Sequence, residues 1–168
     1  MFDYVQKLYE SDIPWEQTRD SIYYRYQVNQ EDGYDITSKN LYCNGCFAAG
    51  INFASSLVSL FYGEGDIKQT IKIGSLAGWD SDNPTATWGG LIGFMIGKDG
   101  IEEEFGRTFS GRYDIHRTRQ NFPNNGIDSF ESMAKNGLTV IDRIVEKQIG
   151  GTVDFEKNIW TIPLKYWR

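Results

Sequence analysis

The stretch GWDSDNPTATWGGLIGFMIG, residues 78–97, places two aspartates one residue apart directly before a glycine-rich segment of helical character. Carboxylate, hydroxyl and amide oxygens gathered in one turn are the ligands that Mg²⁺ and Ca²⁺ prefer. Pro84 suits the first helical position, where a missing N–H costs nothing, and Asp82 or Asn83 is then the expected N-cap. An acid there lies at the positive end of the helix dipole. The stretch predicts a hard-cation site at the start of a helix.

Helical periodicity extends outward from this turn in both directions. Apolar residues recur at helical spacing before the turn and again after Asp128 or Ser129, either of which can cap the last helix. The predicted helices cover residues 2–9, 15–27, 45–62, 67–76, the segment after Pro84, and 128–148. Residues 106–125 lack clear periodicity, and the end of the chain after Gly150-Gly151 is expected to be extended or irregular. We therefore predict an all-α fold in a single domain over residues 1–168.

Two of these helices carry more specific expectations. Gly89, Gly93 and Gly97 recur every four residues and leave one helix face without side chains, which suggests close approach of a second helix or of a ligand. The last helix carries an apolar stripe that we expect to be buried in the core. Its members are Phe130, Met133, Val140, Ile141, Ile144 and Val145.

Composition excludes some classes of function. The chain of 168 residues is 40% hydrophobic, which is ample for a packed core. A formal net charge of −6 argues against broad electrostatic binding to nucleic acid or to anionic membranes. Residues 41–62 contain too many Asn, Ser and Gly for a membrane span, and the first residues lack the features of a secretory signal. We expect no membrane association and a cytoplasmic protein.

Cys43 and Cys46 form a CxxC spacing, which can supply half of a zinc site or a redox pair. A second cysteine pair is missing, and the single histidine, His116, is distant in sequence. Free cysteine packs as a small hydrophobe, so we predict two buried, reduced thiols.

The acidic turn and the basic residues after it each allow two interpretations. Asp80 and Asp82 could hold a cation, or they could cap a helix and solvate a loop. A cap needs only one acid, whereas a cation site uses both. From chemistry alone, cation binding and capping are about equally expected. Among the arginines, Arg112, Arg117 and Arg119 could bind a diphosphate, although pairing with surface carboxylates is the plainer expectation.

The turn also resembles a known family. Residues 78–82, followed by Ala86-Thr87 and the glycine-rich helix, resemble the C-terminal signature of the ADP-ribosylglycohydrolase family, which is related to dinitrogenase reductase-activating glycohydrolase. Residues 44–71 resemble that family's helix, Gly-Asp turn and following short helix. Residues 128–151 and 160–163 are similar to the tail of larger members, so the resemblance covers roughly the whole chain.

The resemblance implies an orthogonal helical bundle with a two-Mg²⁺ centre, in enzymes that hydrolyse the bond joining ADP-ribose to a protein side chain or a small acceptor. It makes Asp80 and Asp82 metal ligands. Asn83 stands where many members have threonine and is a candidate third ligand. Ser81 and Trp79 are candidate substrate contacts. No residue of this chain is identified as the catalytic base.

The family's second ligand set, a Thr-Asp-Asp cluster with an upstream acid, has no counterpart before residue 44. The resemblance therefore implies the C-terminal part of an incomplete bundle. Two Mg²⁺ ions need more carboxylates than Asp80 and Asp82, so we expect weak metal binding, impaired catalysis and possible self-association through the surface left by the missing half. The alternatives are a non-catalytic module that binds ADP-ribose or a protein, and a purely structural helical domain.

Overall fold

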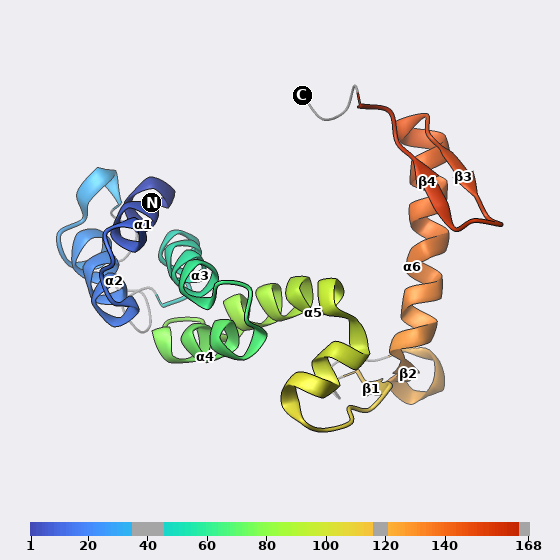
Figure 1. Ribbon diagram of the computed structural model, residues 1–168, viewed down its shortest axis with the longest axis horizontal. Coiled ribbons are helices and arrows are strands. Elements are labelled where there is room, and N and C mark those ends of the chain that lie inside the picture. Colours follow the sequence, from blue (N-terminus) through green and yellow to red (C-terminus); the bar gives the residue numbers. More distant parts are fainter. Residues whose placement is uncertain (35–45, 116–120, 165–168) are drawn as a thin grey trace. The chain divides into compact units, whose positions relative to one another are not determined.

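The computed structural model describes residues 1–34, 46–115 and 121–164 (Figure 1). The chain divides into two compact units, Met1–Thr108 and Phe109–Arg168, and each is considered by itself. Helices predominate among the described residues, with a few short strands. The predicted helical character is confirmed at this level, and the expectation of one domain over residues 1–168 stays a prediction.

The described residues of unit 1 form five α-helices, and four of them match a predicted segment closely. The helices are α1 (Phe2–Glu10), α2 (Trp15–Ile22), α3 (Ala49–Gly63), α4 (Ile67–Ala77) and α5 (Asp82–Phe105). A π-helical turn, η1 (Tyr23–Val28), continues α2, and a short 3-10 turn, η2 (Glu31–Gly33), follows it. The fifth helix, α5, starts earlier than predicted and is kinked at Gly97.

The core of unit 1 is organised around α3, which contacts α1, α2, α4 and α5. Ile51 and Val58 of α3 are fully buried, together with Val5, Ile22 and Ile73 from three other helices. An apolar cluster of this kind is the main source of stability in a small helical unit. The loop between α4 and α5 is attached to this core through Trp79, which packs against it.

Close helix approach occurs between α3 and α4. Gly63 lies so near Thr70 that a methyl group in its place would overlap the Thr70 side chain, and Ser59 Oγ donates a hydrogen bond to the Thr70 carbonyl at 2.7 Å. The predicted close approach along Gly89, Gly93 and Gly97 occurs at Gly93, where an added Cβ would lie 3.0 Å from the Ile101 side chain, and does not occur at Gly97. Gly89 meets the Ile71 side chain at ordinary contact distance, and Gly97 has φ +72° with open space around it. Glycine at position 97 permits the kink in α5, because glycine adopts a positive φ without steric cost.

The described residues of unit 2 form one long helix and two small antiparallel strand pairs. Strands β1 (Arg112–Asp114) and β2 (Ile127–Ser129) pair through Tyr113 and Asp128, with the 3-10 turn η5 (Pro123–Gly126) between them. Ser129 then caps α6 (Phe130–Ile144) by accepting a hydrogen bond from the Ser132 N–H. A π-helical turn, η6 (Val145–Ile149), ends in the left-handed Gly150, as the sequence predicts. The hairpin of β3 (Thr152–Asp154) and β4 (Ile159–Thr161) follows.

The apolar stripe predicted for the last helix is buried at one position. Val145 is 2% exposed, because the chain after Gly150 folds back over it. The other five members are exposed by 39% or more. Periodicity reports that a helix has an apolar face, but it does not supply an element to cover that face. The prediction of a core stripe is therefore wrong for Phe130, Met133, Val140, Ile141 and Ile144.

Two further predictions concern cysteines and membranes. Cys46 is held in a disulfide, so the prediction of a reduced thiol is wrong there, and Cys43 lies outside the described residues. The CxxC spacing is compatible with either oxidation state, and composition does not decide between them. Within residues 1–34, 46–115 and 121–164, none of the helices has the length and apolar character needed to cross a membrane.

Candidate metal centre

The acidic turn joins α4 to α5 and is fixed to α3 by one side chain. Gly78 at φ +99° and Trp79 at φ +56° reverse the chain. The Asp80 backbone N–H then donates to Asn52 Oδ1 at 3.0 Å, while Asn52 Nδ2 donates to the carbonyls of Cys46 and Ala48. Asn52 therefore couples the turn to the start of α3. It was not a predicted site residue, and its signal in the sequence is an amide within an apolar helical stretch.

Asp80 and Asp82 are brought together. When protonated, the Asp80 carboxyl donates a hydrogen bond to Asp82, and this contact is the main cause that raises the pKa of Asp80. Partial loss of hydration and the negative charge of Asp82 raise the pKa further, whereas a hydrogen bond from Asn83 lowers it. Neighbouring carboxylates repel when both are ionised. A shared proton or a cation between them removes that repulsion.

Neither carboxylate caps α5. The helix begins at Asp82, so Asp82 and Asn83 occupy its first two positions and Pro84 its third, and the N-cap residue Ser81 makes no side-chain cap bond. We predicted Asp82 or Asn83 as the N-cap and Pro84 as the first helical residue. This prediction is wrong, because the N-cap is Ser81, one or two residues earlier. The Thr85 hydroxyl lies within hydrogen-bond distance of the Ser81 and Asp82 carbonyls in the first turn of the helix. The carboxylates are thus left available for another partner.

Asn83 contacts Asp80 and holds its carboxylate in place, and the role of Asn83 as a third cation ligand stays a prediction. Its Nδ2 donates to Asp80 Oδ2 at 2.5 Å. Its amide oxygen is the atom left to contribute to a cation. Asp82 and Asn83 are exposed, and Asp80 is half-buried.

The donor set fits one Mg²⁺ and does not fit two. Mg²⁺ is commonly held by one or two carboxylates and keeps several waters, which matches Asp80 and Asp82. Among the described residues, no group of three or more His, Cys, Asp or Glu side chains is placed to hold a metal. A two-ion centre needs additional carboxylates.

The two predicted substrate contacts have structural partners. The Trp79 indole N–H donates to Gln27 Oε1 at 2.6 Å, and the ring packs against the core of unit 1. Ser81 is half-buried, and its carbonyl accepts the Thr85 hydroxyl. Substrate binding by Trp79 and Ser81 stays a prediction.

The basic residues named from the sequence belong to unit 2 or lie outside the described residues. Arg112 lies exposed in β1 of unit 2, and Arg117, Arg119 and His116 lie outside the described residues.

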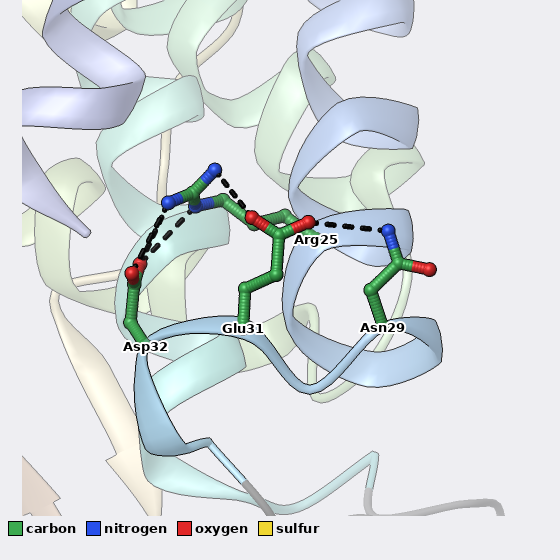
Figure 2. A network of polar contacts seen from close by, with 4 residues as sticks. All are labelled: Arg25, Asn29, Glu31 and Asp32. Atoms are coloured by element: carbon green, nitrogen blue, oxygen red, sulfur yellow. Dashed lines mark hydrogen bonds and ion pairs between the residues drawn. The ribbon is translucent and has the colours of Figure 1, made fainter.

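A second acidic group in unit 1, Glu31 and Asp32, is neutralised by Arg25. Arg25 contacts Glu31 at 2.7 Å and Asp32 at 3.1 Å, and Asn29 donates to Glu31 (Figure 2). The guanidinium also lies over the Tyr4 ring at 4.6 Å. These carboxylates already have an internal cation, so they offer little to an external metal.

Comparisons with known proteins found no match, since no family model, curated protein or solved structure is significantly similar to this chain.

Proposed function

We propose that this chain is the C-terminal part of a Mg²⁺-dependent hydrolase of the ADP-ribosylglycohydrolase type, with Asp80 and Asp82 as cation ligands. The observation that supports the proposal is a turn in which Asp80 and Asp82 lie two residues apart, neither forms a side-chain cap bond to α5, and the neighbouring Asp82 raises the pKa of Asp80. The orthogonal bundle of the family belongs to the same proposal, and the helical character of the chain is compatible with it.

On this proposal, the residues in and around the turn have different roles in binding the cation. Asp80 and Asp82 serve as ligands and not as general base, because a carboxylate bound to a cation is a poor proton acceptor. Asn83 orients Asp80, and Asn52 fixes the backbone of the turn. Bound Mg²⁺ supplies a positive charge that holds hydroxyl oxygens of the substrate and offsets charge that develops during hydrolysis.

A second candidate function is a non-catalytic module that binds ADP-ribose or a protein. The observation that favours it is the absence of a third carboxylate, histidine or cysteine at the turn among the described residues. A site with two carboxylates can position a cation and a diphosphate without completing the chemistry of a two-ion centre. On either proposal the partner is an ADP-ribosylated protein or a small molecule containing ADP-ribose.

The test is a pair of assays on the full chain in Mg²⁺ and in excess EDTA. One is calorimetric titration with ADP-ribose, and the other measures release of ADP-ribose from an arginine-ADP-ribosylated protein. Release that requires Mg²⁺ and is lost in Asp80→Asn supports the hydrolase. Mg²⁺-dependent binding without release supports the module.

Asp99→Asn is the matched control. Asp99 is an exposed carboxylate within α5, so its substitution changes the net charge equally without touching the turn. Neither binding nor release in the wild-type chain would contradict both proposals, as would equal losses in Asp80→Asn and Asp99→Asn.

A further inference from the structure

Unit 2 contains a cavity of about 230 Å³ between α6 and the β3–β4 hairpin. Two contacts hold the hairpin against the helix. The Gly151 N–H donates to the Val145 carbonyl at 2.8 Å, and the Trp160 indole N–H donates to Asp142 Oδ1 at 2.8 Å. The walls of the cavity are therefore set by a backbone bond and by an indole bond to a carboxylate.

The lining combines apolar surface with negative charge. Leu138, Phe155 and Trp160 contribute apolar and aromatic surface, while Asp142 and Asp154 contribute carboxylates. Among the described residues that line the cavity, none is basic. Because Lys157 already pairs with Asp154, Asp142 is the lining carboxylate that can attract a further positive group beside the aromatic faces, and apolar walls suit an aliphatic stem behind it.

The volume limits the size of the ligand. Pockets for drug-sized ligands hold roughly 300–1,000 Å³, so this cavity suits a group the size of one side chain and not a nucleotide. It also lies apart in sequence from the acidic turn of unit 1. The inference below does not rest on the proposed function.

The hydrogen bonds already present favour an ammonium over a guanidinium. Asp142 Oδ1 is occupied by the Trp160 indole, which leaves Oδ2 as the carboxylate oxygen without a contact in the described part of the chain. Both oxygens of Asp154 already accept hydrogen bonds. A guanidinium binds best through two parallel hydrogen bonds to one carboxylate, whereas an ammonium is a point charge that needs one accepting oxygen.

We propose that this cavity binds an alkylammonium group, either the side chain of a lysine or a free amine of similar length, with Asp142 as the counter-charge and Trp160 as the aromatic wall. Lys157 lies on the hairpin, but its ammonium pairs with Asp154 at 3.0 Å. Among the described residues of unit 2, no cation is paired with Asp142, so its second carboxylate oxygen is open to an external cation.

The test is an NMR titration of the full ¹⁵N-labelled chain near neutral pH with pentylammonium chloride and, in parallel, with pentanol. Pentanol has the same stem without the charge. We expect saturable movement of the Trp160 indole N–H signal, identified from the Trp160→Phe spectrum, with a dissociation constant on the order of 1 mM for the ammonium. Pentanol should bind at least about tenfold more weakly, which corresponds to one charge-assisted hydrogen bond.

Matched variants locate the charge that matters. Asp142→Asn keeps an acceptor for the indole and should weaken pentylammonium binding by about tenfold. Glu146→Gln removes an exposed charge from η6, away from the cavity lining, and should leave binding unchanged. N-acetyl-lysine methylamide distinguishes the sources, because binding as tight as that of pentylammonium indicates a protein side chain and clearly weaker binding indicates a free amine. Three results would overturn the proposal: no saturable movement with either amine, equal binding of pentanol, or unchanged binding by Asp142→Asn.

Discussion

The β3–β4 hairpin turn and the α4–α5 turn differ in how far the chain compensates the charge of their aspartates. In the β3–β4 hairpin, Asp154 accepts backbone N–H groups from Glu156 and Lys157 and pairs with the Lys157 ammonium at 3.0 Å. These contacts, led by the bond from Lys157, hold the pKa of Asp154 below its ordinary value. In the α4–α5 turn, the hydrogen bond to Asp82 raises the pKa of Asp80 instead.

The difference separates a structural acid from a candidate functional one. The hairpin supplies its carboxylate with donors and a cation from within three residues, so nothing external is needed. The α4–α5 turn places one carboxylate against another and provides one amide from Asn83. An acidic turn indicates a ligand site when the chain leaves its charge uncompensated.

The largest expected difference concerns the stability of the helices that precede the two turns, α4 and α6. Ile73 in α4 is fully buried, whereas Ile144 in α6 is 43% exposed. Ile73→Ala should lower the free energy of unfolding by about 2–5 kcal/mol. Ile144→Ala should change it by about 1 kcal/mol or less, because exposed sites lose little on truncation. Urea denaturation followed by circular dichroism measures both. Equal losses would show that the apolar face of α6 is covered in solution.

Removing one charge from each turn should have opposite effects on stability, smaller than that of Ile73→Ala. A lowered pKa in the folded state stabilises the fold above the ordinary carboxyl pKa, and this contribution is lost as pH falls through the folded value. Asp154→Asn should therefore destabilise the chain near neutral pH. A raised pKa has the reverse sign, since ionisation opposes folding as pH rises through the folded value. Asp80→Asn should therefore stabilise the chain at neutral pH.

Both differences should fade at acid pH, where the wild-type carboxyls are protonated as well. Thermal melts of the two variants at a series of pH values measure this, with Asp99→Asn as the charge control. A destabilising Asp80→Asn at neutral pH would break the comparison, because it would mean that the ionised Asp80 is already compensated by the chain.

Much of the helical framework follows from the sequence. Periodicity located α1 to α4 because each has a polar and an apolar face, and the Ser129 cap of α6 follows from its residue type. The proximity of Asp80 and Asp82 also follows, since residues two apart in a tight turn have little room to separate.

The remainder depends on contacts between distant residues. The anchoring of the acidic turn depends on Asn52, which lies 28 residues before Asp80. The exposure of α6 depends on what packs beside it, and the disulfide at Cys46 depends on oxidation. None of these is encoded in a local pattern of residue types.

The most direct test of the cation site is calorimetric titration of the full chain with Mg²⁺, set beside the double variant Asp80→Asn, Asp82→Asn. With two carboxylates and otherwise water as ligands, we expect one Mg²⁺ per chain with a dissociation constant on the order of 10⁻⁴ to 10⁻³ M, and no binding by the double variant. Indistinguishable titrations of the two proteins would contradict a site at this turn. Submicromolar binding would contradict its being held by two carboxylates alone.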